Sequence, residues 1–139
     1  MRVVVVYGVL GLMAAACHHG PARSVPSLSF CRQLIPVNAR SVSCDAAVTD
    51  LAPLVGLTHL EELVIHSSVL EDLTPLAGLT RLRLLEVPHS RVRDIAPLLR
   101  LPRLERVNLS GTEVSHDQVE ELIHHVPACR VLTEVWIEP

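Results

Sequence analysis

Three consecutive stretches of 22 residues carry nearly the same phrase, and this repeat constrains the fold more than any other feature. The units begin at Asp50, Asp72 and Asp94, and each opens with the pattern D-[LI]-x-P-L-x-x-L. Self-similarity at a fixed period is typical of solenoids, in which each unit stacks on its neighbours. The sequence therefore predicts one repeat domain rather than a globular fold with a single closed core.

The spacing of apolar residues changes partway through each unit. Leu60, Leu63 and Ile65 follow the pattern L-x-x-L-x-L, and the next two units repeat it. Its last two apolar positions are two residues apart, which is the period of a strand. The D-[LI]-x-P-L segment is too short for a full helix and suits a short helical turn, with Asp capping free N–H groups and Pro near the start.

A single unit is too small to fold alone. Burying about seven aliphatic side chains yields roughly 10–20 kcal/mol. Ordering the backbone of one unit costs roughly 22–44 kcal/mol. Stability must therefore belong to the stacked array, in which each coil covers the open face of the next.

These motifs resemble the leucine-rich-repeat family, in particular the 22-residue type of internalin-like bacterial proteins, over residues 48–115. The resemblance implies an α/β repeat, a short right-handed solenoid with a parallel concave sheet, short convex turns and one C-terminal helix. We expect strands near 41–44, 62–66, 84–88, 106–110 and 130–136. The family usually places Asn three residues after each strand, whereas this chain has Ser68, Ser90 and Thr112. A hydroxyl can replace only part of the amide's hydrogen bonding.

The repeat domain is expected to span 31–139, with an N-terminal cap at 31–49, three repeats at 50–115 and a helix plus last strand at 116–139. Ser115 and Gln118 fit a capping box at the start of that helix. Apolar residues then follow the helical period until Pro127 ends the helix. They are Val119, Leu122, Ile123 and Val126. We expect Trp136 to cover the end of the core.

The cysteines divide into three groups. Cys31 and Cys44 flank the cap and are expected to form a disulfide, with two small buried thiols as the alternative. Cys129 replaces a strand Leu and is expected to be a buried free thiol, with a bridge partner as the alternative. Cys17 follows Ala14-Ala15-Ala16, and this AAAC stretch resembles the lipobox of bacterial lipoproteins, although Ala14 departs from the usual Leu.

The first 16 residues have the pattern of a signal peptide, with Arg2 before an apolar run at 3–13. The alternative is a permanent anchor, but the run is short for a span of ~20 residues. The lipobox resemblance implies a lipid on Cys17 and sorting to the outer membrane, facing the periplasm or the cell surface. Cleavage without lipid remains the alternative. Residues 17–30 then form a lipidated Cys and a flexible linker.

The chain offers little for chemistry. The net charge is −3 and no basic cluster occurs, so no nucleic-acid partner is expected. No recognised catalytic motif is present, and we expect no enzyme activity, cofactor or metal site. The eight His residues leave one rival, a His-rich metal-binding or enzymatic envelope protein. Its candidate ligands are His66, His89, His124 and His125.

The open face of the predicted sheet is the remaining candidate for a functional site. Resemblance to the family implies that this face binds an unknown envelope or extracellular protein, with the chain itself a monomer. The alternative is an ordinary solvated sheet. Five short strands give a face of roughly 400 Å², about half of what one partner buries in a standard interface. The predicted binding residues are Glu62, Val64, His66, Leu84, Glu86, Arg106 and Asn108.

Overall fold

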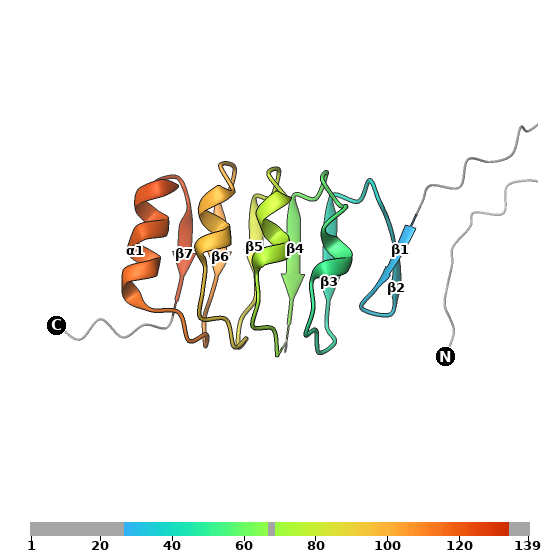
Figure 1. Cartoon of the computed structure of the whole chain (residues 1–139), viewed down its shortest axis with the longest axis horizontal. Helices are drawn as coiled ribbons and strands as arrows, with labels where there is room; N and C mark the ends of the chain where they lie inside the picture. The colour runs from blue at the N-terminus through green and yellow to red at the C-terminus, as the bar shows by residue number, and fades with distance from the viewer. Residues whose placement is uncertain (1–26, 67–68, 134–139) are drawn as a thin grey trace, which may run out of the picture.

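A computed structural model describes residues 27–66 and 69–133, and its main feature is a parallel sheet of five strands. The strands lie side by side in chain order along the solenoid (Figure 1). They are β3 (Ser41–Cys44), β4 (Glu62–Ile65), β5 (Leu84–Glu86), β6 (Arg106–Asn108) and β7 (Arg130–Leu132). Each overlaps a predicted strand position, and the predicted short leucine-rich-repeat solenoid is confirmed.

The repeat period sets the register of the central strands. Glu62 pairs with Leu84, and Leu84 pairs with Arg106, so equivalent residues of successive units lie side by side. Arg106 in turn pairs with Arg130 of β7. The last coil is longer than the others because helix α1 (His116–His125) replaces the short convex turn.

Short 3-10 helices form the convex side of the three repeats. They are η1 (Ala52–Leu54), η2 (Thr74–Gly78) and η3 (Ala96–Arg100), each with Pro in its first turn. One carboxylate oxygen of the preceding Asp accepts a hydrogen bond from a backbone N–H at the start of each helix, at 2.8 Å for Asp50, 2.8 Å for Asp72 and 2.9 Å for Asp94. The predicted role of these Asp residues as caps is confirmed.

The core is a stack of aliphatic layers between the sheet and the convex turns. Leu82 illustrates the arrangement, because it is fully buried and repeats Leu60 and Leu104 of the neighbouring coils. Dispersion contacts and removal of apolar surface from water hold these layers together, with no aromatic residue inside the three repeats.

Hydroxyl groups close the loops that follow β5 and β6. The Ser90 hydroxyl donates to the carbonyl of Val87 at 2.8 Å, and the Thr112 hydroxyl donates to the carbonyl of Leu109 at 2.6 Å. Ser68 lies outside the described residues. At two of the three positions a hydroxyl therefore satisfies loop backbone, as expected for a partial replacement of Asn.

The N-terminal end differs from the prediction. An antiparallel hairpin of β1 (Ser27–Phe30) and β2 (Gln33–Pro36) precedes the solenoid, so residues 27–30 are not part of a linker. Its two-residue turn places Cys31 and Arg32 in the left-handed region, which matches the twist of a tight hairpin. Phe30 and Ile35 are buried in the main core, and this burial orders the segment.

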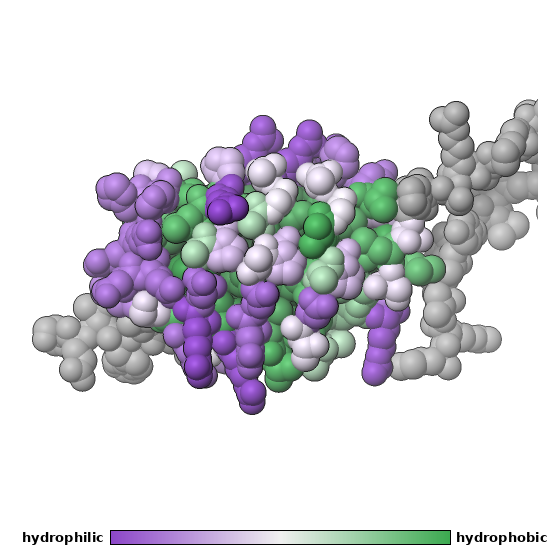
Figure 2. All heavy atoms as spheres, in the orientation of Figure 1, coloured by the Kyte–Doolittle hydropathy of each residue, from purple (hydrophilic) through white to green (hydrophobic). Residues whose placement is uncertain are grey.

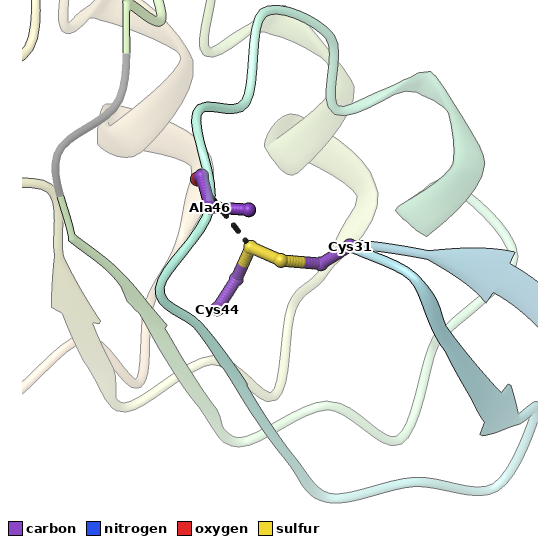
Figure 3. The surroundings of a disulfide bond; sticks show 3 residues. All are labelled: Cys31, Cys44 and Ala46. Atoms are coloured by element: carbon purple, nitrogen blue, oxygen red, sulfur yellow. Dashed lines mark hydrogen bonds between the residues drawn. A yellow bond between two sulfur atoms is a disulfide. The ribbon is translucent and has the colours of Figure 1, made fainter. Parts of the chain in front are cut away.

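A disulfide joins the hairpin to the first coil. Cys31 in the hairpin turn is bonded to Cys44 at the end of β3, with the two Cα atoms 5.9 Å apart (Figure 3). Cys44 is fully buried, and its Sγ lies 3.6 Å from the carbonyl oxygen of Ala46. The sulfur carries no proton and cannot donate, so this is a packing contact. The predicted pairing is present in the structure.

At the C-terminal end, α1 packs on η3 and β7. Val119, Leu122 and Val126 face the core, whereas Ile123, the fourth residue of the predicted apolar pattern, is 45% exposed. The capping box is wrong, because Ser115 makes no side-chain cap and the buried Oε1 of Gln118 has no hydrogen-bond partner. Trp136 lies outside the described residues.

Cys129 is the free, buried cysteine of the described part of the chain, as predicted. Burial raises the pKa of its thiol to about 11, because the thiolate would lose solvation. Within residues 27–66 and 69–133, no helix is long and apolar enough to cross a membrane.

Candidate functional site

Two lateral rows of side chains cover the open face of the sheet, because strand residues alternate between core and solvent. The first row runs Ser41, Glu62, Leu84, Arg106 and Arg130. The second row runs Ser43, Val64, Glu86, Asn108 and Leu132. Six of the seven predicted binding residues thus share this face, and the exposed His66 follows directly after the end of β4.

The face is neither purely polar nor purely apolar. Glu62 and Arg106 are exposed, whereas Val64, Leu84 and Glu86 are half-buried between their neighbours. Leu132 adds a 50% exposed aliphatic side chain at the last strand. Such a mixture of exposed charge and partly covered apolar surface is what protein interfaces use for contact and orientation.

A depression of about 640 Å³ lies along the N-terminal ends of β4 to β7. Glu61 and Glu62 lie at one end, Arg106 and Arg130 lie at the other, and Leu84 lies between them; Arg83 and Glu105, of opposite charge, also line this middle span. The lining residues are Glu61, Glu62, Arg83, Leu84, Glu105, Arg106, Ala128 and Arg130.

Within this depression one ion pair is closed. Arg83 donates from Nε to one carboxylate oxygen of Glu105 at 2.8 Å and from Nη2 to the other at 3.0 Å. This bidentate contact raises the pKa of Arg83 and lowers the pKa of Glu105, chiefly through the hydrogen bonds. Glu61 lies farther from its neighbour, 4.0 Å from Nε of Arg40.

Five of these lining residues, Glu61, Arg83, Glu105, Ala128 and Arg130, were absent from the predicted set. Glu61, Arg83 and Glu105 precede the alternating concave positions, so the strand period did not select them, whereas Arg130 lies in the first concave row itself, on a strand for which no binding residue was predicted. The 22-residue period itself carried a usable signal, because Arg83 and Glu105 are one repeat apart and carry opposite charges.

Charged residues also line the opposite edge of the coils. Arg93 is paired with Glu113 at 2.5 Å, and Arg91 lies 3.9 Å from Glu71. These residues and Asp94 surround a second depression of about 410 Å³. Figure 2 shows hydrophilic side chains projecting from both edges of the solenoid. All four side chains are more than half exposed, so the pairs contribute little to stability.

The His residues are scattered rather than gathered. Nδ1 of His59 lies 3.0 Å from Nη1 of Arg81, and His116 lies 3.0 Å from Glu120 in α1. His124 and His125 contact each other edge to face. Among the described residues, no three or more His, Cys, Asp or Glu side chains are placed to hold a metal ion.

His89 has a structural position instead. It has a left-handed φ of 57°, and its ring lies over Gly111 of the next coil. A Cβ atom at Gly111 would collide with Nδ1 of His89, so the glycine gives room for this contact. The φ of +71° at Gly111 also favours glycine.

The chain is similar to two solved internalins from Listeria monocytogenes. One, InlF, is 25% identical over 70% of this chain and 29% of that chain, with a TM-score of 0.65. The other, internalin C2, is 32% identical over 63% of this chain and 38% of that chain, with a TM-score of 0.54. The protein is a leucine-rich-repeat protein.

A leucine-rich-repeat protein from Leptospira interrogans shares the fold, with 21% identity over 66% of this chain, 24% of that chain and a TM-score of 0.59. This leucine-rich-repeat protein therefore spans well under half the length of the solved structures that it resembles. No family model matches its sequence, and no curated protein does.

Proposed function

We propose that this leucine-rich-repeat protein is a non-catalytic protein-interaction module tethered to the membrane at the bacterial cell envelope. The observation that carries the proposal is the open face of the sheet, on which the half-buried Val64 and Leu84 lie among the exposed charges of Glu62 and Arg106. Similarity in fold to the two solved internalins supports it. The partner is an envelope or extracellular protein, and the module itself is a monomer.

The proposed location rests on the N-terminal sequence and on the disulfide. Residues 1–16 are proposed to be removed as a signal peptide and Cys17 to carry a lipid, both outside the described residues. A disulfide between Cys31 and Cys44 persists only where thiols are not kept reduced, which suits an exported protein. An outer-membrane lipoprotein facing the periplasm or the cell surface would carry the lipid on Cys17 and would keep its disulfide.

The small size of the face shapes the proposed interaction. A sheet of five short strands offers roughly 400 Å², so a partner with a standard interface must also contact the edges. The charged depression beside Arg83 and Glu105 provides such an edge next to the open face. The rival function is a His-rich metal-binding or enzymatic protein; among the described residues, no three or more His, Cys, Asp or Glu side chains are placed to hold a metal ion.

Capture of a partner from envelope extract tests the proposal. Residues 17–139 are immobilised in three forms: wild type, a concave variant and a control variant. The concave variant carries Val64→Ser, Leu84→Ser and Arg106→Ser. The control carries Val55→Ser, Val69→Ser and Arg100→Ser, which likewise removes two aliphatic side chains and one arginine, here at exposed positions away from the open face.

We expect the wild type and the control to retain the same protein, and the concave variant to lose it while keeping its melting temperature. Equal capture by all three forms would place the contact elsewhere on the molecule. One result would favour the rival: the wild type captures no protein but takes up zinc or copper stoichiometrically. That uptake should then be abolished by changing four residues: His66, His89, His124 and His125.

A further inference from the structure

Two arginines oppose each other at the C-terminal end of the first concave row. Arg106 of β6 and Arg130 of β7 are direct register partners, and both are exposed. Like charges at directly opposed strand positions are destabilising. No ion pair within residues 27–66 and 69–133 includes either guanidinium.

The nearest carboxylate in sequence does not neutralise them. Glu105 precedes Arg106, but both of its carboxylate oxygens accept hydrogen bonds from Arg83 of the previous coil. This bidentate contact fixes the orientation of the Glu105 carboxylate. The depression therefore holds the unpaired guanidinium groups of Arg106 and Arg130 beside the paired guanidinium of Arg83.

The other end of the same depression has the opposite sign. Glu61 and Glu62 line it, and Leu84 lies between Glu62 and Arg106 in the row. Neighbouring strands are ~4.8 Å apart, so Glu62 is roughly 10 Å from Arg106 and roughly 14 Å from Arg130 along the row. The depression thus presents negative, apolar and positive positions in order.

We propose that this depression binds an extended segment of a partner protein that carries a carboxylate, an aliphatic side chain and a basic side chain on one face. This inference rests on the proposed interaction function and specifies the partner's chemistry. Alternate residues of an extended peptide lie on one face at ~6.6 Å spacing, so its first and fifth residues are ~13 Å apart. A basic first residue near Glu62 then places an acidic fifth residue between Arg106 and Arg130, with the third residue on Leu84.

Synthetic peptides test this geometry. The probe is a blocked peptide with the core Lys-Ser-Leu-Ser-Glu, and its matched control replaces the final Glu by Gln. Dissociation constants are measured by NMR titration of the wild type, of the double variant Arg106→Glu/Arg130→Glu, and of the charge-matched control Arg91→Glu/Arg100→Glu. Neither Arg91 nor Arg100 lines the depression.

We expect the Glu peptide to bind the wild type and the control variant about tenfold more tightly than the Gln peptide, the gain of a charge-assisted contact. The Arg106→Glu/Arg130→Glu variant should lose this preference and should instead favour a peptide with Lys in the fifth position. Circular dichroism confirms that each variant is folded.

Equal affinity for the Glu and Gln peptides, no measurable binding of the Glu peptide, or an unchanged preference in the double variant would each overturn the inference. The capture experiment separates this failure from that of the proposed function. If a partner is lost by the concave variant but retained by Arg106→Glu/Arg130→Glu, the proposed interaction module is supported and the inferred recognition of an acidic side chain is wrong. A partner retained by both variants would place the contact elsewhere on the molecule and would overturn both the inference and the open face as the binding surface.

Discussion

The buried hydroxyl of Ser90 donates a hydrogen bond of 2.8 Å to the backbone carbonyl of Val87, three residues earlier. Ser90 is only 2% exposed and is the buried polar residue of the described core. The contact satisfies a carbonyl just after β5, where the chain turns from the sheet toward the convex side. A serine hydroxyl can therefore satisfy a loop carbonyl at a position where the leucine-rich-repeat family usually has the side-chain amide of Asn.

Replacing Ser90 with Ala removes this donor and leaves the Val87 carbonyl without it in a buried loop. We expect the free energy of unfolding to fall by about 1–3 kcal/mol. Urea unfolding measures the loss of free energy. Ser110→Ala is the control, because Ser110 is only half-buried and its hydroxyl makes no hydrogen bond within the described residues. Equal stability of Ser90→Ala and wild type would mean that water replaces the hydroxyl without cost.

Replacing Leu82 with Asp tests the register of the repeat. Leu82 is fully buried, so the new carboxylate has no water or partner and the layer loses its apolar contacts. We expect the solenoid to unfold at room temperature, because each coil depends on its neighbours. Thr80→Asp, at an exposed site two residues earlier, should leave the circular dichroism spectrum and the melting temperature unchanged. A folded Leu82→Asp variant would contradict the register.

The disulfide should stabilise the N-terminal end. Replacing both Cys31 and Cys44 with Ala opens a loop of about 14 residues, which is worth ~3 kcal/mol in the chain-entropy model. We expect the double variant to lose about that much free energy of unfolding under oxidising conditions. Reduction with dithiothreitol should lower the free energy of unfolding of the wild type by a similar amount and leave that of the variant unchanged. A wild type that is insensitive to reduction would show that the bridge adds no stability.

The Arg83–Glu105 contact predicts a small acid sensitivity. Arg83 lowers the pKa of Glu105 in the folded chain below its usual value of 4.5. The contact therefore stabilises the fold at pH values above about 4.5, and this contribution disappears as the pH falls through the lowered folded pKa. NMR titration should show the Glu105 pKa rising in Arg83→Ala but not in Arg103→Ala. Identical Glu105 titrations in wild type and Arg83→Ala would contradict the contact in solution.

Processing at Cys17 is a separate prediction. Mass spectrometry of the N-terminal peptide from cell membranes should show Cys17 as the first residue with a diacylglycerol modification, and Cys17→Ser should release the protein from the membrane fraction. An unmodified Cys17 peptide in the soluble periplasmic fraction would indicate a secreted repeat protein. An uncleaved N-terminus would instead support the permanent anchor.

The sequence alone determined the repeated part of the fold. A fixed 22-residue period aligns equivalent side chains of successive coils, so Leu60, Leu82 and Leu104 had to stack and the strand positions followed from them. The Asp caps at the convex turns followed from local chemistry, since a carboxylate two residues before a free N–H needs no distant partner.

Only the tertiary structure decided the parts that interrupt the period. The hairpin of β1 and β2 has no repeat pattern and is ordered by burial of Phe30 and Ile35 against the first coil. Helix α1 changes the length of the last coil, so the pairing of Arg106 with Arg130 could not be counted from the repeat. Which arginine is neutralised depends on side-chain geometry across coils, and Glu105 reaches back to Arg83 while Arg106 and Arg130 stay unpaired within the described residues.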